Sequence, residues 1–105
     1  MIIEKIERAP KEIVEGFKSL LSYDSVTCAV SDSMGRFNAM TAAMKPLYPG
    51  IRFVGTAVTV RTLAADIAAP FKAIDLCDPG DVILIDSHGS QDTAFWGENM
   101  TMSAI

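Results

Sequence analysis

The sequence predicts a small α/β domain, and three stretches carry this prediction. Residues 79–89 open with Pro79-Gly80, a turn signal, and continue with four aliphatic residues, Val82–Ile85, bounded by aspartates. A short continuous apolar run of this kind is typical of a strand buried on both faces. Residues 52–62 are rich in strand-forming side chains, and a helical pattern follows over residues 66–77.

Two helices are predicted before the first strand. The first begins at Ala9-Pro10, because proline is favoured at the first helical position, and its apolar side chains recur at helical spacing: Ile13, Val14, Phe17, Leu20 and Leu21. The second covers roughly residues 25–34 after the capping stretch Ser22–Ser25, with an inner face of Val26, Ala29, Val30 and Met34. Gly35 is placed to end it in a left-handed conformation.

The segment Phe37–Met44 is apolar but has no clear period. Its neighbourhood holds Met34, Met40 and Met44. Flexible thioethers of this kind fill gaps in a core, line an adaptable pocket or form a subunit contact, and the sequence leaves these alternatives open. Pro46, Pro49 and Gly50 then predict a loop.

The strand over residues 52–62 is expected to place Val58 and Val60 on one face and Thr59 and Arg61 on the other. Asp66 is a candidate N-cap of the helix that follows, with Pro70 in its first turn or so. The expected inward side chains of this helix are Ile67, Phe71, Ile74 and Cys77.

Composition bounds the class of protein. The 105 residues suffice for one domain, residues 1–105, and half of them are hydrophobic, which excludes a disordered chain. No apolar run approaches the roughly 18–20 residues of a membrane span, and the charged N-terminus does not resemble a signal peptide, so a cytoplasmic location is expected. Cys28 and Cys77 are expected to be reduced, buried thiols.

The charges are unevenly distributed. The net charge is −4, and residues 53–105 hold two basic and seven acidic side chains. This bias argues against a nucleic-acid partner, which needs clustered lysine and arginine. It is compatible with a divalent cation held by oxygen ligands, and equally with an ordinary acidic surface.

Several common catalytic sites are absent from the sequence. There is no phosphate-binding or dinucleotide-binding glycine motif, and two distant cysteines with one histidine make no zinc site. Asp86, Ser87 and His88 are adjacent, whereas a catalytic triad needs residues that converge from separate elements. His88 is therefore expected to be a hydrogen-bonded loop histidine, with a role as ligand or proton carrier as the alternative.

A last helix is predicted over residues 98–105, opened by Gly97. The start of a helix gathers free backbone N–H groups, which suit a carboxylate or a phosphate. The sequence Gly97-Glu98-Asn99-Met100 alone is weak support for such a site, because many helices begin with a glycine and an acid.

Four blocks, in order, resemble one family. The first block, Val30-Ser31-Asp32-Ser33-Met34-Gly35-Arg36, is similar to the family's Val-Ser/Ala-Asp-Ala-Leu-Gly-Arg stretch. The second, residues 55–61, is similar to its Gly-Pro-Ala-Val-Thr-Val, and the third, residues 79–86, to its Pro-Gly-Asp-Val-Leu-Val-Val-Asp. The fourth, Trp96-Gly97-Glu98, is similar to its Gly-Glu or Gly-Asp loop. The family is that of the regulator of ribonuclease E activity A and the 4-hydroxy-4-methyl-2-oxoglutarate aldolases, formerly labelled dimethylmenaquinone methyltransferase-like. Several blocks in order are more specific than any single motif.

The resemblance implies a layered β/β/α, swivelling-domain-like fold, assembled as a homo-trimer or a hexamer with active sites between subunits. It implies that Gly97, Glu98, Asn99 and Met100 form the substrate loop, and that Glu98 is a catalytic residue that reaches Mg²⁺ or Mn²⁺ through water. Asp66 matches the aspartate of a Gly-Asp-Asn segment, with Ala65 and Ile67 as its differing neighbours. In the aldolases, an Arg-Asp pair about twenty residues beyond the loop completes the metal site.

The sequence ends at Ile105 without that pair, so we expect these residues to be the N-terminal two-thirds of the fold, incomplete at its C-terminus, with no tightly bound metal. The expected function is that of a metal-dependent aldolase or decarboxylase domain, acting on 4-hydroxy-4-methyl-2-oxoglutarate or oxaloacetate to give pyruvate and inactive as this fragment. The alternatives are a shortened homologue that binds without catalysing, and a protein-binding regulator that resembles the inhibitor of ribonuclease E.

Overall fold

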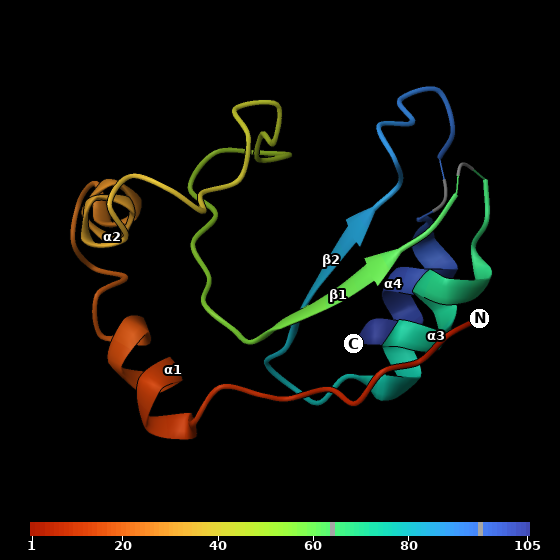
Figure 1. The fold of residues 1–105 in the computed structure, drawn as a ribbon, viewed down its shortest axis with the longest axis horizontal. Helices are drawn as coiled ribbons and strands as arrows, with labels where there is room; N and C mark the ends of the chain where they lie inside the picture. Colours follow the sequence, from red (N-terminus) through yellow and green to blue (C-terminus); the bar gives the residue numbers. More distant parts are fainter. Residues whose placement is uncertain (64, 95) are drawn as a thin grey trace. The chain divides into compact units, whose positions relative to one another are not determined.

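The structure is a computed structural model that describes residues 1–63, 65–94 and 96–105. Its elements, in chain order, are α1 (Lys11–Lys18), α2 (Val26–Ser33), β1 (Ala57–Arg61), α3 (Ala68–Leu76), β2 (Val82–Asp86) and α4 (Glu98–Ala104), as drawn in Figure 1. The chain divides into two compact units. The helical unit is Pro10–Val54, and the sheet unit combines Met1–Ala9 with Gly55–Ile105. The α/β class predicted from the sequence is confirmed at this level, whereas a single domain over residues 1–105 stays a prediction.

The helical unit contains α1 and α2. Both helices begin and end within a few residues of their predicted bounds, although Pro10 is the N-cap of α1 rather than its first helical residue. Gly35 has a φ of +68° just after α2, as predicted for a residue that ends a helix. Arg52 closes the unit, because its Nη1 donates to the backbone carbonyls of Leu21 and Tyr23, the latter at 2.8 Å.

No described residue of the helical unit is fully buried. Val26 and Val30 of the predicted inner face of α2 are half-buried, whereas Ala29 and Met34 are exposed. Met40 and Met44 are also exposed, so these methionines do not fill a core in this chain. The apolar face of a helix needs a partner surface to be stabilised, and the unit carries much apolar side-chain area without one.

The sheet unit is built on a parallel pair of strands, β1 and β2. Ala57 pairs with Val82 and Arg61 with Asp86, in unbroken register. Val58 and Val60 are buried while Ala57, Thr59 and Arg61 are exposed, which confirms the predicted alternation. The predicted strand over residues 52–62 was too long, because only five of these residues pair with β2. Residues Val82–Ile85 are half-buried, so the prediction of complete burial on both faces was wrong.

Helix α3 contacts both strands and α4. Its fully inward residues are Pro70 and Ala73, and Met100 of α4 completes the buried set on this side. The prediction that Ile67 and Phe71 face inward was wrong, because both are more than two-fifths exposed. Small side chains let the helix lie close to the sheet, so Pro70 and Ala73 take the inner positions.

The N-terminal segment is fixed to the sheet unit by Arg8. Its guanidinium donates to the Asp81 carboxylate at 2.9 Å and to the Leu76 carbonyl at 2.8 Å, and it pairs with Asp78 at 3.2 Å. The Asp81 side chain is only 6% exposed and also accepts the backbone N–H of Asp78 at 2.8 Å. Burial alone would raise the pKa of this carboxyl, but the bonds from Arg8 and Asp78 outweigh it and lower that pKa below its ordinary value.

The two cysteines have different surroundings, which corrects the expectation that both are buried. Cys28 is exposed, and Cys77 is half-buried at the end of α3. Burial raises the pKa of the Cys77 thiol above its ordinary value, and the negative charge of Asp81 raises it further.

We therefore expect Cys28 to react with iodoacetamide on the order of tenfold faster than Cys77 at pH 7.5, because the thiolate is the nucleophile and Cys77 combines a raised pKa with poor access. Peptide mass spectrometry after timed alkylation measures both rates in one sample. The same reaction in concentrated urea is the control, in which the two rates should converge. Equal rates in the folded chain would contradict the structure around Cys77.

Within the described residues, none of the helices has the length and apolar character that crossing a membrane requires.

Candidate functional site

The start of α4 is the first part of the candidate site. Gly97 precedes the helix in an extended conformation, with φ −127° and ψ −173°, and its carbonyl accepts the N–H of Thr101 at 3.1 Å. The N–H groups of Glu98, Asn99 and Met100 lie in the first turn, where a helix offers no backbone acceptor of its own. The predicted helix bounds are thus confirmed to within one residue. The role of residues 97–100 in binding substrate stays a prediction.

A chain of hydrogen bonds fixes this turn. The indole Nε1 of Trp96 donates to Thr101 Oγ1 at 2.9 Å, and Thr101 Oγ1 donates to the carbonyl of Gly97 at 3.2 Å. The peptide group between Gly97 and Glu98 is therefore held through two donors on its oxygen, which sets the direction of its N–H. Trp96 also lines a small apolar cavity of about 340 Å³ with Ile83, Ile85 and Ala104. Sequence reasoning missed the contribution of Thr101, although a threonine four residues after a helix start is a visible signal.

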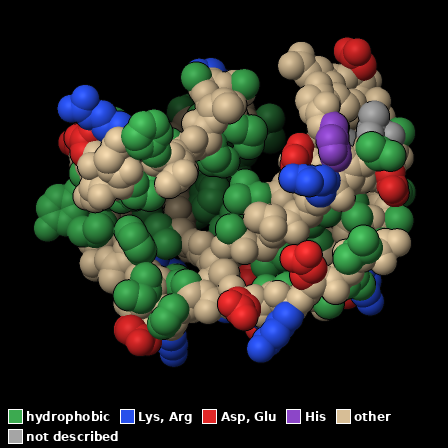
Figure 2. Space-filling model, in the orientation of Figure 1, with side chains coloured by type: hydrophobic (Ala, Val, Ile, Leu, Met, Phe, Trp, Pro, Cys, Tyr) green, Lys and Arg blue, Asp and Glu red, His purple; other side chains and the backbone are tan. Residues whose placement is uncertain are grey.

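The second part of the candidate site is the carboxyl edge of the sheet, where β1 and β2 both end. The ring of His88 lies against the end of β1, with Nδ1 2.8 Å from the carbonyl oxygen of Thr62. Because a carbonyl only accepts, Nδ1 carries the proton and the other ring nitrogen, Nε2, is left for a further contact. The prediction of a hydrogen-bonded loop histidine is confirmed. Figure 2 shows this histidine, in purple, at the surface beside basic and acidic side chains.

Neighbouring polar groups hold this edge together. The Asp86 carboxylate accepts the backbone N–H of His88 at 3.0 Å and lies 3.7 Å from Arg61 Nε. The buried Thr62 hydroxyl donates to the carbonyl of Asp66 at 2.8 Å. Thr62 was not singled out from the sequence, because its carbonyl meets His88, 26 positions away, only through the pairing of β1 with β2.

Asp66 serves the start of α3. Its Oδ1 accepts the N–H of Ala68 at 3.0 Å, but the N-cap residue is Ile67 and no side chain caps the helix, so the prediction of Asp66 as the N-cap was wrong. This carboxylate is therefore already engaged in structure. Among residues 1–63, 65–94 and 96–105, no three histidine, cysteine, aspartate or glutamate side chains lie close enough together to hold a metal ion.

Comparison with known proteins identifies the family of this chain. Residues 27–105 match the RraA-like family, described as Aldolase/RraA, and the chain belongs to this family. The match includes β1, α3, β2 and α4, and so the whole of the candidate site. The resemblance seen in the sequence blocks is thus confirmed.

A particular relative is a protein of Halalkalibacterium halodurans named "Putative 4-hydroxy-4-methyl-2-oxoglutarate aldolase", which is 36% identical over 72 residues. The aligned part is 69% of this chain and 34% of that protein, so the chain spans about a third of the relative's length. No solved structure matches the chain.

Proposed function

We propose that this chain provides the carboxylate-binding part of an aldolase active site, for a 2-oxo acid such as 4-hydroxy-4-methyl-2-oxoglutarate or oxaloacetate that is split to give pyruvate. Membership of the Aldolase/RraA family and the name of the bacterial relative support the substrate class. The observation that carries the proposal is the helix start at Gly97, which lies inside the matched region. The finer layered β/β/α arrangement is part of the same proposal.

The N–H groups of Glu98, Asn99 and Met100 would bind the substrate carboxylate. An anion at this point gains from hydrogen bonds to backbone donors that lack helical partners and from the positive end of the helix. The bonds from Trp96 and Thr101 keep the turn in place before the ligand arrives, which reduces the entropy lost on binding. A bound carboxylate would fix the orientation of the rest of the 2-oxo acid.

Glu98 opposes this binding when it is ionised, because its negative charge lies on the residue that donates the first N–H. In the aldolases, Mg²⁺ or Mn²⁺ would offset that charge and stabilise the enolate. The described residues of this chain do not offer a metal-binding group of three side chains, so they do not fit the ion by themselves. We therefore expect carboxylate binding in the millimolar range, about −4 kcal/mol, and no detectable pyruvate release from the chain alone.

The test is a titration of the isotopically labelled chain with pyruvate, followed by NMR of its amides. We expect the largest shifts at Glu98, Asn99 and Met100. Glu98→Pro removes one donor at a position where helices tolerate proline, and should weaken binding about tenfold. Glu98→Gln is the matched control: it keeps the N–H, removes the repelling charge and should bind more tightly than the parent chain.

The loop would be refuted as the carboxylate site if the largest amide shifts lay at other residues, or if Glu98→Pro bound pyruvate as tightly as the parent chain. A pyruvate-release assay with Mg²⁺, run on the same samples, tests the second half of the proposal. Turnover of oxaloacetate or 4-hydroxy-4-methyl-2-oxoglutarate by the chain alone would show that the metal site has been misplaced.

A protein-binding regulator, of the kind that inhibits ribonuclease E, is the second candidate. The observation in its favour is the apolar surface of the helical unit, where Phe37, Leu47 and Tyr48 are each more than three-fifths exposed. Large exposed apolar groups of this kind mark protein contacts. Inhibition of ribonuclease E by the chain, unaffected by Glu98→Pro, would favour this function over the aldolase.

The same exposed side chains support assembly. We propose a homo-trimer or a hexamer, since the exposed apolar side chains and the outer edge of β2, which pairs with no further strand among the described residues, both need covering. Sedimentation velocity at micromolar concentration measures the mass directly, and a clean monomer would refute the proposal.

A further inference from the structure

The outer edge of β1 is open in the described part of the chain. The carbonyl of Thr56 and the N–H of Thr62 bond to β2, and residues of a strand point their backbone groups alternately to the two sides. The intervening residues Ala57, Thr59 and Arg61 therefore direct their N–H and C=O groups away from β2. The sheet has two strands only among these residues, so this row of donors and acceptors faces no third strand.

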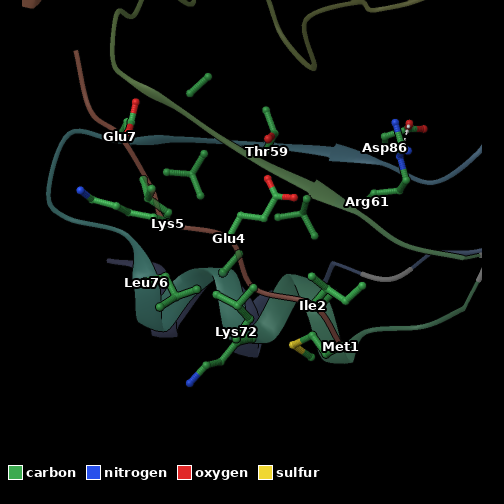
Figure 3. Close-up of a pocket in the computed structure, with 17 residues that line it drawn as sticks. Met1, Ile2, Glu4, Lys5, Glu7, Thr59, Arg61, Lys72, Leu76 and Asp86 are labelled. Carbon is green, nitrogen blue, oxygen red and sulfur yellow. Dashed lines mark ion pairs between the residues drawn. The ribbon is translucent and has the colours of Figure 1, made fainter.

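A groove of about 1170 Å³ runs along this edge. One wall is β1 itself, from Ala57 to Arg61, and the floor includes Ala69, Ala73 and Leu76 of α3. The other wall is the N-terminal segment Met1–Glu7. Figure 3 shows the segment passing alongside β1, with Glu7 near the start of the strand and Met1 toward the end where Arg61 lies. The segment and β1 therefore run in opposite directions.

The N-terminal segment has the composition of a β-strand but lacks the backbone hydrogen bonds of one. It contains three isoleucines, Ile2, Ile3 and Ile6, whose β-branched side chains favour extended backbone. In the described chain, residues 1–9 take part in no backbone–backbone hydrogen bond. Ile2 is 92% exposed and Ile3 is 52% exposed, so these side chains are not yet packed.

Arg8 supplies the fixed end. Its bonds to Asp81 and to the Leu76 carbonyl hold the segment at one end of the groove. Seven extended residues reach about 23 Å and the five residues of β1 span about 16 Å, so the free part can cover the whole open edge. Because Arg8 tethers the segment close to β1, its effective concentration at this edge is in the millimolar range. The segment therefore competes well against a free partner that is present at a lower concentration.

We propose that Ile2–Ile6 close onto the outer edge of β1 as an antiparallel third strand, a strap that pivots at Arg8. Closure pairs the free backbone groups of Ala57, Thr59 and Arg61 and brings the exposed isoleucines against the sheet. Opening restores the groove and presents an unpaired strand edge, the surface to which extended segments add. The strap therefore controls access to this edge.

Amide hydrogen exchange on the full chain tests the proposal. We expect the N–H groups that face the groove, at Thr59 and Arg61, to exchange at least about tenfold more slowly than an unpaired edge allows, because closure pairs them. Glu4→Pro and Lys5→Pro each remove one N–H from the strap. Backbone groups of alternate residues in a strand face the neighbouring strand, so the N–H of either Glu4 or Lys5 points to β1 in the closed strap. At least one of the two proline variants must therefore abolish this protection. Glu4→Gln and Lys5→Gln are the matched controls, and both should retain it.

The proposal would be overturned if the exchange rates of Thr59 and Arg61 in both proline variants equalled their rates in the parent chain. A second measurement covers a variant that fails to fold: a chain lacking residues 1–7 should regain the protection when a synthetic peptide of residues 1–8 is added in millimolar excess. No effect of the peptide contradicts the strap. Protection that disappears when the parent chain is diluted from about 100 µM to about 1 µM also contradicts it, since it would assign the third strand to a second copy.

Discussion

The variant Gly55→Ala should lose the native sheet unit. A Cβ at this position would overlap the backbone carbonyl oxygen of Gly80 and would lie 2.9 Å from Val82 Cγ2. The first clash involves backbone, which has no alternative rotamer, and it lies at the entry to both β1 and β2. Overpacking typically costs about 1–3 kcal/mol, and because a backbone atom is in the way here the cost should lie at the upper end, a large share of the stability of a small domain.

Urea denaturation followed by Trp96 fluorescence measures this loss, because Trp96 belongs to the sheet unit. We expect a transition shifted to much lower urea or no folded baseline at all. Gly16→Ala is the control. It lies within α1, nothing approaches its added Cβ within 4 Å, and alanine should raise helix stability by about 0.5–1 kcal/mol. A Gly55→Ala chain as stable as its parent would disprove the close approach of residues 55 and 80.

The variant Asp81→Asn should destabilise the sheet unit at neutral pH and lose that effect in acid. The folded pKa of Asp81 is lowered from its ordinary value of 3.8, so the carboxylate contributes stability above that ordinary pKa. That contribution disappears as the pH falls from there through the folded pKa. Thermal midpoints of the two chains should therefore differ at pH 7 and approach each other as the pH falls below the ordinary aspartate pKa and through the lowered pKa of folded Asp81.

Asp78→Asn is the matched control for this measurement. Asp78 also pairs with Arg8, at 3.2 Å, but its side chain is 67% exposed, and exposed ion pairs contribute little. The midpoint of Asp78→Asn should stay close to that of the parent at both pH values. A pH-independent difference between Asp81→Asn and the parent would mean that the buried carboxylate is not the group that titrates.

Local patterns predicted the elements well. The alternation of Val58 and Val60 with exposed neighbours, the left-handed Gly35 and the helix start at Gly97 all follow from nearest-neighbour chemistry. The prediction for the inner face of α3 was wrong, because hydrophobicity favours Ile67 and Phe71, while close packing against the sheet favours the smaller Pro70 and Ala73. Strand length also depends on where the partner strand ends, which the sequence of one strand does not contain.

Contacts distant in sequence could not be predicted. Arg8 and Asp81 are separated by 73 positions, and charge pattern alone does not select this pair from nine basic and thirteen acidic residues. The same holds for His88 and Thr62, which meet only because β1 and β2 end at the same edge. For the candidate site, the sequence identified Gly97–Met100 through family resemblance, and their role in binding stays a prediction.

The parallel register has a consequence for the order of folding. Ala57 pairs with Val82 and each later pair keeps the same 25-residue separation, with α3 inside the intervening loop. Closing a loop of this length costs about 3 kcal/mol of chain entropy, less than the pairing of distant strands demands in most β-rich proteins. Residues 57–86 can therefore form the folding nucleus, with substitutions at Val58, Ala73 or Ile83 slowing folding, whereas changes around Arg8 should mainly speed unfolding.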